Sequence, residues 1–383
     1  MPVGRNRRSS AILPSPEQAL LLAAIFGPDA GAAGAIRAWE SRTNLDTLDS
    51  ASTRLLPLAY HRLTRLGIAS PNIARYKGWF RQTIYRNHLL LGQARVVLQR
   101  FDNAAIPALV LKGAALAHAY YPHFGLRPMN DFDVLVPSTA AAGAIDATMA
   151  DGVWLPDLRL VHAQVEVRHA TAFRTGAGLE IDLHWHLLHE ACFGDADLPF
   201  WSSAVPLSLP GLATRMLCPS DMLFHICAHG SKWCEASPYW VADALCVYRR
   251  DPASIDWSRI ADLAIRRELT PALLPTLTHL RETWQVAVPP EILREICRAP
   301  VRPIALRYHD HMAGPPRPVQ ILLGPWIRYA RITSHLSFWR RLVGFPRHLR
   351  LLWDKDSFWE LPATAIQKIR EQILGRTAGR SET

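Results

Sequence analysis

The order of hydrophobic and polar positions divides the chain into a helical first part, an α/β middle part and a helical last part. Apolar residues recur with helical spacing over about 16–27, 31–40, 49–66 and 71–102. After Pro107 the pattern changes, because the short apolar run 108–111 is typical of a buried strand. We therefore expect an α+β fold rather than an all-helical one.

The middle part contains further segments that predict a small mixed sheet with flanking helices. Residues 131–136 alternate as a strand does, 163–173 and 178–186 predict a hairpin, and 204–209 predicts an edge strand. An alanine-rich stretch over 138–150 predicts a helix beside them. The hairpin is expected to bring its second strand against the rest of the sheet.

This pattern divides the chain into five segments, the third of which contains the sheet. They are a flexible basic leader at 1–14, an N-terminal helical region at 15–104, a sheet-containing core at 105–215, a C-terminal helical region at 216–374 that is basic from about 298, and a disordered tail at 375–383. Ser15, Ser220 with Asp221, and Asp256 are predicted helix caps.

A glycine turn follows the first predicted strand. Lys112-Gly113-Ala114-Ala115 predicts a turn of small residues, and 114–121 predicts a short helix after it. A strand, a glycine turn and a helix in that order allow backbone N–H groups to approach a phosphate. Lys112 can add a positive charge, so this segment indicates a phosphate-binding turn.

Acidic residues are placed at alternate positions of two predicted strands. Period 2 puts Asp131 and Asp133 on one face of their strand, and Glu180, Asp182 and His184 on one face of the later strand. Neighbouring carboxylates repel each other unless a cation lies between them, and a divalent metal ion is the usual cation. Solvated acids on a strand face would show the same spacing. If the two strands are neighbours, Asp182 can join the other two aspartates around two metal ions.

The glycine turn, the two acids and the later acidic strand together resemble the DNA polymerase beta-type nucleotidyltransferase superfamily. The fuller strings L-K-G-A-A-L, G-L-R-P-M-N-D-F-D-V-L-V and L-E-I-D-L-H-W resemble the bacterial uncharacterised nucleotidyltransferase family within it. Ala114 departs from the pattern, which usually has a second glycine or a serine there. No side-chain hydroxyl is therefore present at that position.

The resemblance implies metal-dependent transfer of a nucleoside monophosphate from a nucleoside triphosphate to a hydroxyl or phosphate acceptor, such as a small molecule, a peptide or a sugar. It implies two Mg²⁺ or Mn²⁺ ions held by the catalytic residues Asp131, Asp133 and Asp182. The residues expected at the phosphates are Lys112, Gly113, Ala114 and Arg127. Glu180 and His184 are expected to orient Asp182 or the acceptor, and Arg127 has an alternative role in a structural ion pair.

Two other functions fit the same residues. One is a toxin-like enzyme that adds nucleotides to tRNA. The other is a nucleotide-binding or scaffold protein whose catalytic site has decayed, which Ala114 favours and the intact aspartates oppose.

Composition adds a preference for anionic partners. The 383 residues carry a net charge of +10, and 49% of them are hydrophobic, which fits a folded protein rather than a disordered one. Residues 298–355 hold ten arginines and Lys355 against Asp310 and Asp354, with aromatic residues between them. This region can bind RNA, bind an anionic membrane surface, or pack as helices whose arginines face water.

The remaining signals concern location and a second metal site. Six cysteines without a C-x-x-C pair indicate reduced thiols and a cytoplasmic protein, and no apolar run is long enough to span a membrane. No signal peptide is evident at the N-terminus. His225 and His229 have the helical spacing of metal ligands, but packing explains them more simply. Asp243 matches an aspartate of the resembling family, although a buried cap explains it equally well.

Overall fold

The N-terminal region consists of helices, as the apolar spacing predicts. The computed structural model describes residues 13–230, 238–313 and 320–378, so the predicted leader lies almost wholly outside it. Ser15 caps the first helix in a capping box with Gln18. The predicted helix over 49–66 is divided in two near Arg54. The helices are α1 (Pro16–Phe26), α2 (Asp29–Glu40), α3 (Ser50–Thr53), α4 (Leu56–Leu66) and α5 (Ile73–Asn103).

A seven-stranded mixed sheet forms the centre of the fold, which confirms the predicted α+β class. The strand order is β3-β4-β5-β2-β1-β7-β6, and β2 runs parallel to β5 as β1 does to β7. The strands are β1 (Leu109–Val110), β2 (Asp131–Leu135), β3 (Leu155–Pro156), β4 (Ala170–Arg174), β5 (Glu180–His184), β6 (Val205–Leu209) and β7 (Leu212–Met216). Helices α6 (Lys112–Ala119), α7 (Ala141–Met149) and α8 (Leu198–Ser203) connect them.

The predicted elements agree with this sheet except at four places. The hairpin is β4–β5 and the edge strand is β6, but β3 and β7 were not predicted. The expected strand over 163–173 is wrong in its first half, because His162–Glu166 form a 3₁₀ helix. The turn expected at Lys112 is also wrong, since α6 already begins there.

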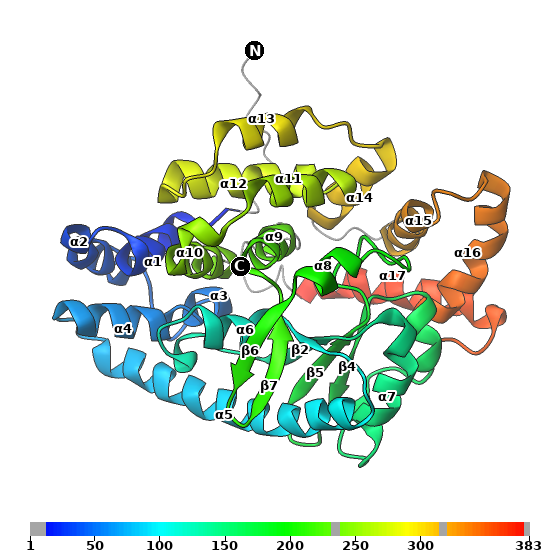
Figure 1. Ribbon diagram of the computed structural model, residues 1–383, viewed down its shortest axis with the longest axis horizontal. Helices are drawn as coiled ribbons and strands as arrows, with labels where there is room; N and C mark the ends of the chain where they lie inside the picture. The colour runs from blue at the N-terminus through cyan, green and yellow to red at the C-terminus, as the bar shows by residue number, and fades with distance from the viewer. Residues whose placement is uncertain (1–12, 231–237, 314–319, 379–383) are drawn as a thin grey trace.

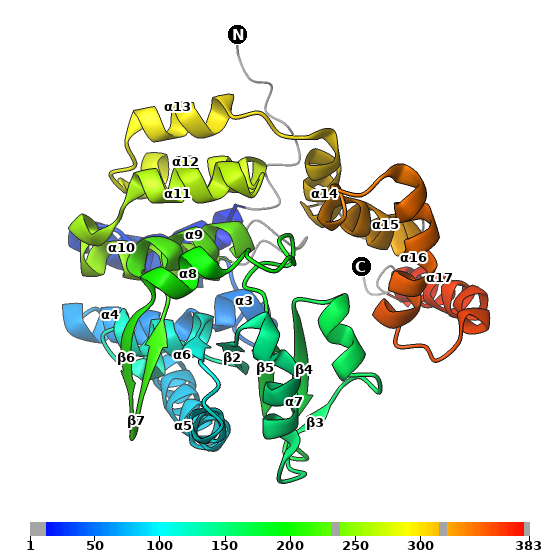
Figure 2. The same ribbon diagram turned by 45° about the vertical axis from the view of Figure 1, so that its right-hand side comes forward.

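The two faces of β2 have different surroundings. Phe132 and Val134 are each only 1% exposed and point to the side of the sheet that α5 covers. Asp131 and Asp133 point to the other side because side chains alternate along a strand. Figures 1 and 2 show α5 crossing the lower part of the sheet, with α9 and α10 stacked above it.

The last part of the chain is helical again. Its helices are α9 (Pro219–Gly230), α10 (Tyr239–Arg250), α11 (Trp257–Arg266), α12 (Thr270–Trp284), α13 (Pro290–Arg298), α14 (Pro303–Ala313), α15 (Gln320–Ile332), α16 (Phe338–Leu352) and α17 (Leu361–Ala378). α17 extends four residues into the tail that the sequence predicts to be disordered. Among the described residues, no helix is both long enough and apolar enough for a membrane crossing.

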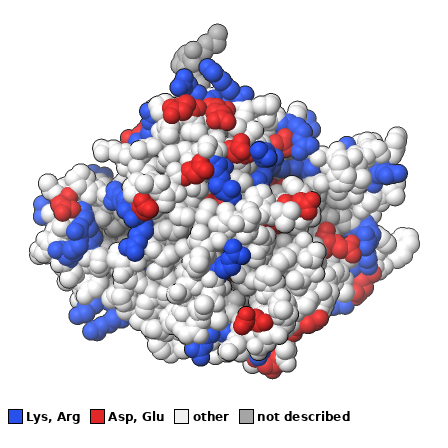
Figure 3. Space-filling view, viewed as in Figure 1, with Lys and Arg blue, Asp and Glu red and all other residues white. Residues whose placement is uncertain are grey.

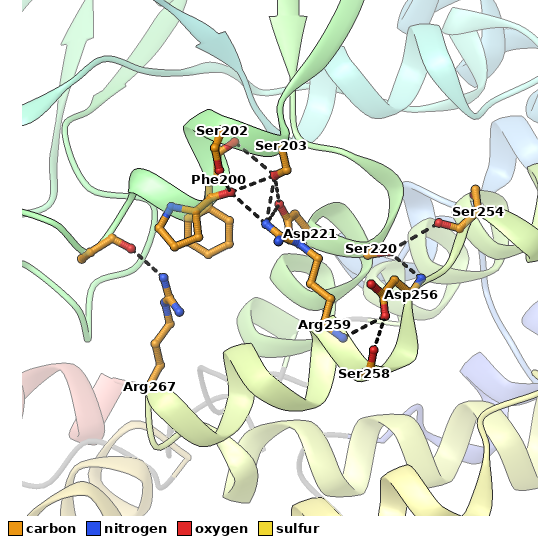
Figure 4. A network of polar contacts seen from close by, with 12 residues as sticks. Phe200, Ser202, Ser203, Ser220, Asp221, Ser254, Asp256, Ser258, Arg259 and Arg267 are labelled. Carbon is orange, nitrogen blue, oxygen red and sulfur yellow. Dashed lines mark hydrogen bonds and ion pairs between the residues drawn. The ribbon is translucent and has the colours of Figure 1, made fainter.

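A buried polar cluster ties α9 to the sheet-containing core. The Asp221 carboxylate, 0% exposed, accepts two bonds from the Arg259 guanidinium of α11 and one from the Ser203 hydroxyl of α8 (Figure 4). Asp256 caps α11 beside it, as predicted. Removing one partner of a buried ion pair costs several kcal/mol of stability. The cluster therefore fixes the position of α9 over the sheet.

Candidate active site

One cavity of about 530 Å³ collects most of the residues that the sequence marks as functional. The sheet side of its wall contains Lys112, Gly113, Asp131, Asp133 and Asp182. Its other walls come from α3, α9 and α10. A volume of this size is typical of small-molecule sites.

The sheet register explains why three distant acids meet. β2 and β5 are parallel neighbours, with Asp133 directly opposite Asp182 and Asp131 directly opposite Glu180. The period-2 alternation then puts Asp131, Asp133 and Asp182 on the same face. The Glu180 carboxylate accepts a hydrogen bond from Arg174 at 2.8 Å.

Lys112 comes to the same face from the neighbouring strand. β1 pairs with β2, and the Leu111 N–H donates to the Asp133 carbonyl at 3.0 Å, so the next residue emerges beside the acids. The Lys112 Nζ lies 2.5 Å from Asp133 Oδ1. Its φ of 35° is in the left-handed region, which costs a residue with a side chain about 1–3 kcal/mol. The ion pair offsets part of that strain.

His184 is closer to the acids than the sequence suggested. Its Nε2 lies 3.1 Å from Asp133 Oδ1 and 3.0 Å from Asp182 Oδ2. Burial opposes a positive charge on the imidazole, but the two carboxylates outweigh burial and raise its pKa to about 9. His184 is therefore protonated at neutral pH and bridges the two aspartates as a donor.

These contacts give the three acids different electrostatic states. Burial disfavours the ionised form of both Asp133 and Asp182. The positive charges of Lys112 and His184 outweigh burial at Asp133, and the charge of His184 outweighs it at Asp182. The pKa of each carboxyl therefore lies below its ordinary range. Asp131 has no ion-pair partner among the described residues. Burial and the Asp133 charge raise its pKa to about 6.

Arg127 lines the cavity beside Gly113, and two of its nitrogens are engaged in an ion pair. Its Nε and Nη2 donate to the two Asp243 oxygens at 2.9 and 2.8 Å, and both side chains are about 8% exposed. Tyr121 also donates to Asp243 at 2.6 Å. Asp243 is thus an interior residue of α10 rather than a helix cap. The structural ion pair considered for Arg127 is present, and its partner is 116 residues away in sequence.

Gly113 and Ala114 differ in what they offer a ligand. A Cβ at Gly113 would stand 2.9 Å from Arg127 Nη1 and 3.1 Å from Met129 Cγ, so any side chain would displace its neighbours. Gly113 lines the cavity, whereas Ala114 is 0% exposed and belongs to the core. The missing hydroxyl at Ala114 therefore has little bearing on phosphate contacts.

Sequence reasoning missed Arg54 and Tyr239, which lie opposite the acids. They line the cavity from the end of α3 and from α10, next to Trp240, and Arg54 stacks over the Tyr239 ring at 4.6 Å. No local motif marks Arg54, which ends a four-residue helix far from the acids in sequence. His225 and His229 line the same wall on α9, with ring centroids 6.0 Å apart. In the described parts of the chain they belong to no cluster with metal-ligand geometry.

The acids form a set that can hold a divalent cation. Asp133, Asp182 and His184 offer ligand atoms that all lie within 4.8 Å of one another. Asp131 adds a third carboxylate on the same face, and carboxylate oxygens suit Mg²⁺ and Mn²⁺. Because the His184 Nε2–H donates a hydrogen bond to the aspartates and has no free lone pair for a metal, the carboxylates are the better ligands. The donor set therefore fits a hard divalent metal.

The arginines of the basic region 298–355 are of two kinds: some bind other parts of the chain and some are exposed. Most of its described arginines bind other parts of the chain, as in the contacts Arg302–Glu268, Arg347–Glu166, Arg328 to the Val167 carbonyl, Arg331 to the Arg267 carbonyl, and Arg350 to the Asp356 carbonyl. The first half of α16 differs, because Arg340 is exposed beside Trp339 and Val343, which are 72% and 80% exposed. On the face seen in Figure 3, basic and acidic side chains are interspersed. The first half of α16 is therefore a candidate docking surface.

The cysteines give no sign of a second metal centre. The five described cysteines are free thiols, and Cys234 lies outside the described residues. Cys227 is buried and Cys246 is half-buried, and desolvation raises the pKa of each thiol to about 12. Both thiols therefore stay protonated at neutral pH.

Comparison with known proteins gives one match. A family model described as "Uncharacterised nucleotidyltransferase" matches residues 50–285, which is more than half of the chain. The matched segment begins at α3, contains the whole sheet and the cavity, and ends just after α12. Searches of curated proteins and of solved structures found no match.

Proposed function

The chain belongs to the uncharacterised nucleotidyltransferase family, and we propose that it transfers a nucleoside monophosphate from a nucleoside triphosphate to an acceptor. The observation that carries the proposal is the cavity where Asp131, Asp133 and Asp182 share one face of adjacent strands with Lys112 beside them. Family membership supports nucleotidyl transfer in general. The acceptor, which can be a small molecule, a peptide or a sugar, is the open part of the proposal.

We propose that Asp131, Asp133 and Asp182 hold two Mg²⁺ or Mn²⁺ ions. Two such ions would lower the pKa of the acceptor hydroxyl and stabilise the leaving pyrophosphate. His184 serves this set by donating to Asp133 and Asp182, which keeps both carboxylates ionised and oriented. We propose that in this role it is a positioning residue.

The phosphates are assigned to the start of α6. Gly113 allows close approach of the backbone because any side chain there would clash with Arg127 and Met129. Lys112 is 23% exposed at its side chain and can turn from Asp133 to a phosphate oxygen when another cation neutralises that carboxylate. Arg127 pairs with Asp243 through Nε and Nη2, and its Nη1, next to Gly113 in the cavity lining, is the group proposed to reach a phosphate.

Two metal-dependent readouts test the activity. Purified protein is incubated with each α-labelled nucleoside triphosphate and a lysate, with Mg²⁺, with Mn²⁺ or with chelator, and the label is followed into RNA, protein and small molecules. We expect metal-dependent release of pyrophosphate that D133N abolishes and that R62Q, a change outside the cavity, retains. Release by D133N at the parental rate would overturn the proposal.

The same experiment separates the other functions considered. Label in tRNA, together with RNA binding by α16, would favour the toxin-like enzyme. Triphosphate binding without pyrophosphate release would favour a decayed nucleotide-binding protein. The free thiols agree with a cytoplasmic location, which we include in the proposal.

A further inference from the structure

The charges around the cavity leave two groups without an opposite charge. Asp133 and Asp182 are matched by Lys112 and His184, and Asp243 is matched by Arg127. Asp131 and Arg54 are left, and in the described part of the chain neither has an ion-pair partner. They line the same cavity from opposite elements, β2 and the end of α3.

Arg54 is held in place without using its charge. Its guanidinium stacks on the Tyr239 ring at 4.6 Å, and Nη2 makes one long hydrogen bond of 3.4 Å to the Pro128 carbonyl. Its Nε is buried and has no hydrogen-bond partner among the described residues, which is unfavourable for a donor. The Tyr239 ring holds the guanidinium at the cavity wall, where its outer amino groups can reach a ligand.

We infer that Arg54 binds the triphosphate of the nucleotide substrate, as a site for phosphate oxygens across the cavity from the three aspartates. This inference rests on the proposed function for the identity of the substrate. A metal–triphosphate complex presents positive charge to Asp131 and negative charge to Arg54, and so it balances both unmatched groups. The planar guanidinium suits phosphate, since its N–H donors form a fixed fork.

A calorimetric titration tests Arg54 without turnover. The probe is inorganic tripolyphosphate, titrated into the full-length protein in chelator and again with Mg²⁺. R54Q keeps most of the side-chain length but removes the charge, and we expect it to raise the Kd about 10- to 100-fold, the loss typical of a charge-assisted hydrogen bond. R54K should restore part of the affinity, and the salt dependence of binding should be smaller in R54Q than in the parent.

R62Q is the matched control. Arg62 pairs with Asp29 and donates to the Gly27 carbonyl in the same helical region, and it does not line the cavity. It should lower stability while leaving the Kd for tripolyphosphate unchanged. Equal Kd values for R54Q and the parent would overturn the inference. An equal loss of tripolyphosphate affinity in R54Q and R62Q would show a structural role for Arg54 and overturn the inference too. So would an equal loss in R54Q and R54K that comes with a lower Tm.

The outcome is separable from that of the proposed function. If the parent binds tripolyphosphate through Arg54 but never releases pyrophosphate, transfer fails and the phosphate site stands. If the parent transfers nucleotides and R54Q also does, with an unchanged KM for the triphosphate, the proposed nucleotidyl transfer is supported and the proposed role of Arg54 is refuted.

Discussion

Replacing Asp133 with asparagine should destabilise the metal-free protein as well as abolish activity. From the sequence alone, removing one of several neighbouring acids relieves repulsion and predicts an unchanged or higher Tm. The structure reverses that expectation, because the Asp133 carboxylate accepts from both Lys112 and His184 while it is 1% exposed. The asparagine amide cannot neutralise either cation.

The size of the effect follows from those two contacts. Removing one partner of a buried ion pair costs about 3–5 kcal/mol. Lys112 is 23% exposed and can reach water, and His184 can lose its proton, so we expect about 2–3 kcal/mol for D133N at pH 7. For a chain of 383 residues that unfolds as one unit, this corresponds to a fall in Tm of about 2–4 °C.

D131N is the matched comparison on the same strand. Asp131 has no ion-pair partner among the described residues, and burial with the Asp133 charge raises its pKa to about 6. Its negative charge therefore destabilises the metal-free protein, and D131N should gain about 1–2 kcal/mol after allowance for partial exposure. Both variants should lose nucleotidyl transfer.

Scanning calorimetry of the parent, D131N and D133N in chelator at pH 7 measures both effects. We expect D131N to have the highest Tm, the parent an intermediate Tm and D133N the lowest Tm. If D133N melts at or above the parent, Lys112 and His184 do not depend on Asp133 for their charge, and the reasoning is refuted. Full activity of D133N would refute its proposed role in metal binding.

Three further predictions concern other parts of the molecule. Burial, with the charge of Arg328, lowers the pKa of His348 from 6.5 to about 3, so its stabilising neutral form is complete above pH 6.5 and lost as the pH falls toward 3. Urea titrations at pH 7 and pH 5 should show a loss of stability that H348F reduces. G113A should lower pyrophosphate release at least about 10-fold, because its Cβ displaces Arg127; a parental rate would show that the close packing at Gly113 does not matter for activity. R340E with R341E should weaken binding to RNA or to anionic vesicles, and flatten its salt dependence, if the first half of α16 is a docking surface. Binding that is unchanged for both would assign α16 to packing alone.

Local sequence pattern determined the elements and much of the chemistry. Period-2 alternation marked β2 and β5, and it placed Asp131, Asp133 and Asp182 on strand faces before their partners were known. Such periodicity is readable because a strand has only two faces and one of them is buried. The strand β7 was missed because its half-exposed residues do not form an apolar run.

Only the tertiary structure decided which charges meet. Arg127 pairs with Asp243 across 116 positions, and Arg54 reaches the cavity from a helix end that carries no motif. Lys112 contacts Asp133 because β1 pairs with β2, and His184 bridges two acids because β5 is the parallel neighbour of β2. Hydrophobic spacing encodes what an element is, whereas strand order and helix packing set the distances between charged groups. The sequence thus specified the acids, and the fold decided which of them are neutralised and which remain for a ligand.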